Sequence, residues 1–188
     1  MPQRVGMLPW RANEEFERLT EDMRDYRLRA ATHRPVEGAE QAVLYDVGLL
    51  GHYVADGSQP LHTTIDYNGW VEVKNPGGFA RGRGIHSEFE TRFVHSNIRA
   101  ADVRALVPAN PRFLNSPFED FVKYLRVSHS HVAELYRLGK RGGFAGTGTA
   151  ESRSFTAERL AAGAAMLRDM IATAWVQSGR HLDGRHPR

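Results

Sequence analysis

Three histidines and two carboxylates in the first half of the chain stand at spacings that suit metal coordination. His52 and Asp56 are four residues apart, as are His86 and Glu90, and His62 lies between the two pairs. Residues four apart on a helix share one face, so each pair could direct two donor atoms at one ion. Together, His62, His86 and Glu90 supply two imidazoles and one carboxylate. This donor set is typical of catalytic zinc sites, which keep a fourth position open for water or substrate.

Each candidate ligand also has a simpler explanation. Ser87 and Glu90 fit a capping box, in which the Glu90 carboxylate would bond the start of its own helix. His52 lies on a mostly apolar segment and could be a hydrogen-bonded core residue. Asp56 is harder to explain without a cation, because a carboxylate at a helix C-terminus costs about 0.3–1 kcal/mol against the helix dipole. Since His52 and Asp56 supply only two donors, a second ion beside them would need a further group.

The elements that must position these residues follow from apolar periodicity. The sequence predicts five helices, at about 10–29, 37–56, 86–104, 116–138 and 156–177, with Gly57 as a left-handed cap of the second. Residues 58–85 are glycine-rich and lack a sustained period, so we expect one long loop, and a loop of that length usually has a functional reason. Residues 140–154 predict a mobile surface loop. The ligands would therefore come from two helices and the loop between them.

The remaining histidines have no partner at a ligand spacing. His129 and His131 are two residues apart on a predicted helix, so their side chains point in different directions. We expect solvated or capping roles for both of them.

Composition sets broad limits on fold and function. The 188 residues are 41% hydrophobic, which is enough for one domain with its own core. A pI near 9.4 mildly favours anionic partners such as phosphodiesters. Cysteine is absent, which excludes disulfides and thiolate zinc sites. No apolar run approaches the roughly 18 residues of a membrane span, and the first ten residues lack the apolar core of a signal peptide.

Two segments that carry the candidate ligands resemble the signatures of one superfamily. Residues 51–62, Gly-His-Tyr-Val-Ala-Asp-Gly-Ser-Gln-Pro-Leu-His, and residues 84–90, Gly-Ile-His-Ser-Glu-Phe-Glu, are similar to motifs of zinc-dependent phospholipases C and single-strand-specific zinc nucleases. Residues 157–175 resemble the last helix of that superfamily. The resemblance covers about 8–179 and implies an all-α multi-helix bundle with a long ligand-bearing loop. It also implies up to three zinc ions and a metal-activated water that attacks the phosphorus of a phosphodiester.

The resemblance assigns a role to each candidate ligand. It places His52 and Asp56 on one zinc, with Asp56 bridging to another, and His62, His86 and Glu90 on a third. Members of the superfamily begin with a tryptophan whose terminal amine binds zinc, followed by further His and Asp ligands. Nothing upstream of Leu8 in this sequence can hold those residues, and Trp10 follows nine others. We therefore expect an N-terminally incomplete domain at 8–179, a basic tail at 180–188 and a general base upstream of this chain.

The sequence thus predicts a zinc-dependent phosphodiesterase whose substrate is a phospholipid or single-stranded nucleic acid. A nuclease would use aromatic platforms for base stacking, and Tyr67 and Trp70 are the candidates in the long loop, although Trp70 better suits a core or pocket-wall position. Secretion or a periplasmic location is what the resemblance implies. One alternative is a non-catalytic or degenerate zinc-binding helical domain that retains one metal site. The other is a helical interaction domain without metal.

Overall fold

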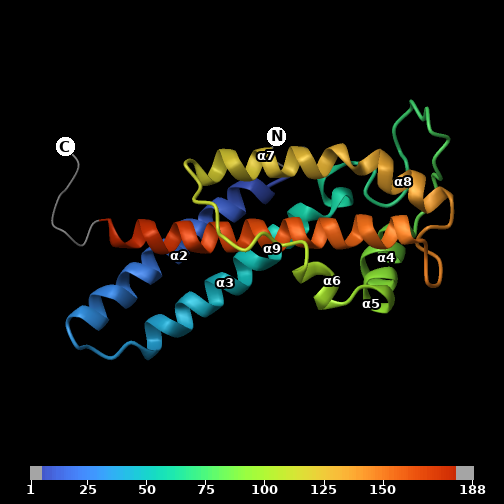
Figure 1. The fold of residues 1–188 in the computed structure, drawn as a ribbon. Helices are drawn as coiled ribbons and strands as arrows, with labels where there is room; N and C mark the ends of the chain where they lie inside the picture. Colours follow the sequence, from blue (N-terminus) through green and yellow to red (C-terminus); the bar gives the residue numbers. More distant parts are fainter. Residues whose placement is uncertain (1–5, 181–188) are drawn as a thin grey trace. The chain divides into compact units, whose positions relative to one another are not determined.

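The computed structural model describes residues 6–180, and this part of the chain is helical without β-strands (Figure 1). The predicted all-α class is confirmed. None of the helices in this range is long and apolar enough to cross a membrane. Residues 181–188 of the predicted basic tail lie outside the described residues. The elements in chain order are α2 (Leu8–Ala31), α3 (Glu37–Ser58), η1 (Pro60–Thr63), α4 (Ile85–Ser87), η2 (Glu88–Phe93), α5 (Val94–Asn97), α6 (Ala100–Arg104), α7 (Pro117–Ser130), α8 (Val132–Lys140) and α9 (Ala150–Gly179).

The chain divides into two compact units, both of which are discontinuous in sequence. Among the described residues, the first unit comprises 6–54, 109–122 and 165–180, and the second comprises 55–108 and 123–164. Helices α3, α7 and α9 run from one unit into the other. The three candidate ligands His62, His86 and Glu90 all belong to the second unit, so its internal structure positions them.

In the first unit, α2 and α3 follow each other through a short turn at 32–36. Helix α2 begins with Pro9 in its first turn and buries Phe16, Leu19 and Met23 at helical spacing. The turn contains His33 in the left-handed region, with φ of 52°. This conformation ends α2 and allows α3 to start at Glu37.

Carboxylates from α2 and α3 are buried together in the first unit. Glu15 is 4% exposed and Asp46 is 5% exposed, and each has one carboxylate oxygen without a hydrogen-bond partner among the described residues. Burial, a hydrogen bond with Asp22 and the charge of Glu15 raise the pKa of Asp46 from 3.8 to about 6. Ionisation of Asp46 therefore costs the folded state more than the unfolded chain.

We expect Asp46→Asn to stabilise the protein at pH 8 but not at pH 4. Because folding raises the pKa of Asp46, its protonated carboxyl makes its full contribution to the free energy of unfolding below pH 3.8. This contribution is lost as the pH rises towards 6. Asparagine cannot ionise, so the variant keeps that stability, on the order of 1 kcal/mol or more. Thermal melts at both pH values measure the effect. Glu17→Gln, at an exposed position of α2, is the control, and equal shifts for both variants would contradict the prediction.

The second unit is built around a cluster of buried aromatic and aliphatic side chains. The cluster contains Leu61, Trp70, Phe79, Phe89, Phe93, Val132, Leu135, Tyr136, Leu138, Phe144 and Phe155. These residues come from η1, the segment 64–84, η2, α8, the connection 141–149 and α9, so each of these parts contributes to the same core. The packing of Trp70 at 9% exposure excludes it as a platform for base stacking.

The segment 64–84 is irregular but tied to α8 by a buried phenol. The Tyr136 hydroxyl accepts a hydrogen bond from the Gly69 amide at 2.9 Å and donates one to the Asp66 carbonyl at 2.5 Å. Burial raises the pKa of Tyr136, which keeps the phenol protonated and able to donate. The Asp66 carboxylate in turn accepts from the amides of Val71 and Glu72. The backbone of the predicted long loop is thus held by hydrogen bonds to the side chains of Tyr136 and Asp66.

Tyr136→Phe should destabilise the fold by about 1–3 kcal/mol, because it leaves a buried amide and a buried carbonyl without partners. Urea unfolding followed by circular dichroism measures this change. Tyr67→Phe is the matched control, since Tyr67 is 54% exposed in the same segment. A change of less than about 0.5 kcal/mol in both variants would show that the Tyr136 hydroxyl does not hold the segment.

Several predicted helix boundaries were wrong. The predicted helix 86–104 is interrupted at Ile98 and Arg99, which are extended. Helix α5 ends at Asn97, whose side-chain Nδ2 donates hydrogen bonds to the backbone carbonyls of Phe93 and Gly146. The predicted helix 116–138 breaks at His131 into α7 and α8.

The ends of α3 and α9 also differ from the prediction. Gly57 does not cap α3, because the helix continues through it to Ser58. Helix α9 begins at Ala150 rather than at 156, since Thr149 and Ser152 satisfy each other's backbone amides through their hydroxyls. The predicted surface loop 140–154 is correspondingly shorter.

Candidate metal centre

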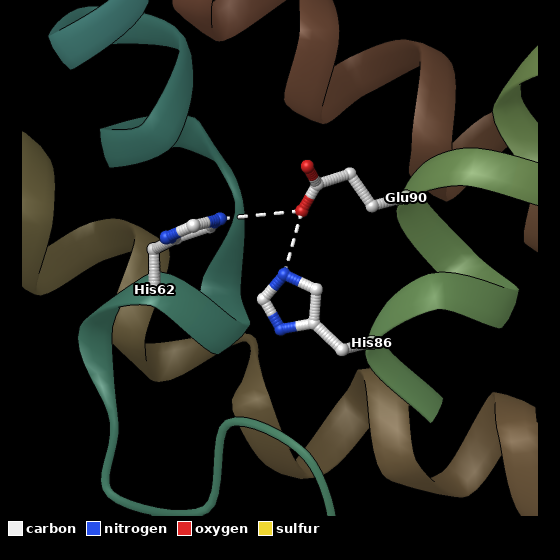
Figure 2. A group of neighbouring side chains, drawn as sticks. All are labelled: His62, His86 and Glu90. Atoms are coloured by element: carbon white, nitrogen blue, oxygen red, sulfur yellow. Dashed lines mark hydrogen bonds and ion pairs between the residues drawn. The ribbon is translucent and has the colours of Figure 1, made fainter. Parts of the chain in front are cut away.

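His62, His86 and Glu90 converge in the second unit from three different elements. His62 lies in η1, His86 in α4 and Glu90 in η2 (Figure 2). One Glu90 oxygen, Oε2, lies 3.2 Å from His62 Nε2 and 2.8 Å from His86 Nε2. The two imidazole rings meet edge to face, with their centroids 4.9 Å apart. The spacing pattern in the sequence therefore predicted the grouping of these three side chains.

The three donor atoms are close enough together to hold one metal ion. They all lie within 4.8 Å of one another. Zinc bound at about 2.0–2.2 Å in a tetrahedral site separates its ligands by roughly 3.4 Å. The His62–Glu90 distance is near this value, and the shorter His86–Glu90 distance is that of a direct hydrogen bond. Small rotations of the side chains would therefore convert the hydrogen-bonded group into a coordination sphere.

The orientation of His86 is determined by the segment 64–84. Its Nδ1 lies 3.0 Å from the carbonyl of Tyr67, so the ring donates there and directs Nε2 towards Glu90. Asn68 Oδ1 accepts from the amide of Gly84 at 2.8 Å and holds the start of α4. A histidine whose second nitrogen is bonded to a backbone carbonyl is the usual arrangement of a metal ligand.

Gln59 connects the two other ligands. Its Nε2 donates to Glu90 Oε2 at 3.0 Å, and its Oε1 accepts from the Leu61 amide at 2.6 Å, which caps η1. One amide side chain therefore holds the carboxylate of η2 and the turn that carries His62. Gln59 is 8% exposed, so this bridge is buried.

The electrostatics of the group favour an ionised Glu90. Burial disfavours its carboxylate form, but the hydrogen bond from Gln59 and the charges of His62 and His86 outweigh this effect and lower the pKa of Glu90. The alternative that Glu90 caps its own helix is wrong. The start of η2 has no side-chain cap, and the Ser87 hydroxyl donates to the Gly84 carbonyl.

A π-helix carries Glu90. Residues 88–93 form η2, a turn of this wider type, between two short α-helical segments. Phe89 and Phe93 of η2 are almost fully buried, whereas Glu90 remains partly exposed beside the imidazoles. Single π-turns of this kind occur frequently at functional sites.

The other predicted pair is divided between the two units. Asp56 belongs to the second unit, and its Oδ1 lies 4.0 Å from His62 Nε2. His52 belongs to the first unit, where it is exposed with its ring 5.7 Å from that of Tyr53. Asp56 is thus adjacent to the three-donor group without being part of it. A role for His52 and Asp56 as ligands of further ions stays a prediction.

Some contacts of the site carried no signal that sequence reasoning used. His129 was expected to be solvated or to cap a helix, but its Nδ1 lies 2.9 Å from the carbonyl of Thr63, next to His62. Gln59 and Asn68 stand in or near the motifs, and only their hydrogen-bond partners reveal their supporting roles. The pairs His52/Asp56 and His86/Glu90 were recognisable from helical spacing and His62 from its motif, whereas these contacts join distant elements.

No protein-family model matches this chain, and neither does any curated protein or solved structure. The resemblance to zinc-dependent phospholipases C and nucleases therefore rests on the two motifs, and its functional implications remain proposals.

The purified chain should bind one zinc ion, and Glu90→Ala should weaken that binding by more than about 100-fold. Loss of a direct ligand exceeds the roughly 10–100-fold effect of removing a residue that only supports a ligand. Zinc should raise the melting temperature of the wild type and leave that of the variant unchanged, because bound metal stabilises the folded state. Competition with a chromophoric chelator and thermal melts measure both quantities.

Glu88→Ala is the matched control, since Glu88 lies in the same π-helix but does not belong to the three-donor group. Equal zinc affinity of the two variants would contradict the assignment of Glu90 as a ligand.

Proposed function

We propose that this protein is a zinc-dependent hydrolase of phosphodiester bonds. The observation that carries the proposal is the meeting of two imidazoles and one carboxylate at a partly exposed position beside a cavity. The side chains of His62, His86 and Glu90 are 30%, 24% and 43% exposed. Three protein donors leave a zinc ion with room for a further ligand, which is the arrangement of catalytic rather than structural zinc.

Different residues of the chain would have different roles at such a site. His62, His86 and Glu90 would hold the ion, while Gln59 and the Tyr67 carbonyl keep the donors in place. When bound, zinc would polarise the phosphoryl group and make water a stronger nucleophile. Asp56 offers a further carboxylate beside His62, and it suits a second ion or a hydrogen bond to the attacking water. The resemblance to the superfamily supports the same reaction.

The substrate class is either a phospholipid or single-stranded nucleic acid. Tyr67 is exposed, and its ring centroid lies 6.3 Å from that of His86. Base stacking requires an exposed aromatic ring, and Tyr67 provides one beside the candidate metal centre. This favours nucleic acid as the substrate. Trp70, the other aromatic residue considered for this role, is buried in the core.

The chain should hydrolyse a chromogenic phosphodiester in zinc, at a low rate, and lose this activity in chelator. A low rate is expected because one ion cannot stabilise the attacking and leaving oxygens together as neighbouring ions do. Glu90→Gln should reduce hydrolysis to background, whereas Glu88→Gln should leave it unchanged. Release of nitrophenolate with time measures the rate.

Two outcomes would argue against this function. Tight binding of one zinc without any hydrolysis would favour the alternative of a non-catalytic zinc-binding domain. Hydrolysis that persists in chelator would place the activity elsewhere in the molecule or in a contaminant.

A further inference from the structure

A small cavity adjoins the candidate metal centre within the second unit. It encloses about 130 Å³ and is lined by Asp56, His62 and Glu90, by apolar side chains such as Phe89, and by Arg159 of α9. This volume is well below the roughly 300–1,000 Å³ of pockets that take whole drug-sized ligands. The cavity therefore suits one small group of a substrate, with the rest of that substrate outside it.

Arg159, which lines this cavity, also carries a buried hydrogen-bond donor without a partner among the described residues. Its Nε is buried and has no hydrogen-bond partner within residues 6–180. A guanidinium group is always charged and carries five N–H donors. Buried donors in native proteins are nearly always paired, so a partner outside the described protein atoms is expected here.

The phenol of Tyr124, which interacts with Arg159, does not neutralise the charge of the guanidinium. Burial raises the pKa of the Tyr124 phenol well above its ordinary value, and the hydrogen bond with Ser58 and the charge of Arg159 only partly oppose this rise. The phenol is therefore neutral at physiological pH. An anion in the cavity would be a counter-ion for the guanidinium of Arg159.

We propose that Arg159 recognises the phosphoryl group of the substrate by donating hydrogen bonds to its non-bridging oxygens inside this cavity. The proposal rests on the proposed function, because phosphodiester hydrolysis supplies the anion. The planar guanidinium fork matches two oxygens of a phosphoryl group. Arg159, His62 and Glu90 all line this cavity, so an anion held there would be next to residues that would hold the ion. Arg159 is thus assigned to substrate recognition and not to metal binding.

Inorganic phosphate is a suitable probe, because it presents the same oxygens as a phosphodiester. Calorimetric titration should show that phosphate binds the zinc-loaded wild type and that Arg159→Met weakens this binding by at least about tenfold. Arg159→Lys keeps the charge without the fork and should give an intermediate affinity. Zinc affinity, measured by chelator competition, should be the same in all three proteins. Arg92→Met removes an exposed arginine of the same unit and serves as the control.

The outcomes separate this inference from the proposed function. Unchanged phosphate affinity in Arg159→Met would overturn it, as would failure of the zinc-loaded wild type to bind phosphate. A parallel loss of zinc affinity in Arg159→Met would overturn it as well, because Arg159 would then act by positioning the metal ligands. Phosphate binding that depends on Arg159 in a protein without hydrolytic activity would support the inference while the proposed function fails. Circular dichroism melts of each variant verify that it is folded.

Discussion

Hydrogen bonds of the Tyr136 hydroxyl anchor the irregular segment 64–84 to helix α8, and the candidate site depends on these bonds. The phenol bonds to the amide of Gly69 and the carbonyl of Asp66, which flank the short turn that carries Tyr67 and Asn68. Oxygen atoms of these two residues hold the ring of His86 and the start of α4. A ligand on one helix is therefore oriented by a buried side chain on another, with an ordered loop between them.

Protein contacts hold the donor atoms of the candidate site. Gln59 holds Glu90, the Tyr67 carbonyl holds His86, and η1 presents His62 from a turn that Gln59 caps. Side chains that are already ordered lose little conformational entropy when they bind an ion. The same contacts explain why the carboxylate of Glu90 is ionised although it is partly buried.

The sequence was sufficient for those features that depend on local spacing. The all-α class followed from apolar periodicity, and the meeting of His62, His86 and Glu90 followed from their separations within two motifs. The interruption of the helix at Ile98 could not be predicted, because it depends on a hydrogen bond from Asn97 to Gly146. The order of the glycine-rich loop likewise depends on Tyr136, which lies 70 residues beyond its partner Asp66. Arg159 gave no signal, since an arginine on a helix is usually solvated.

The geometry around the π-helix η2 depends on the number of residues in this helix as well as on their types. A π-turn contains more residues than an α-turn, so the stretch from 88 to 93 advances its side chains by a smaller angle per residue than a regular helix. Within it, Phe89 and Phe93 both reach the core while Glu90 reaches the imidazoles. Deletion of a single residue here would favour a regular helix and rotate the downstream residues relative to the upstream ones. The arrangement would then lose either a core aromatic or a metal donor, even though every amino acid needed for both was still present.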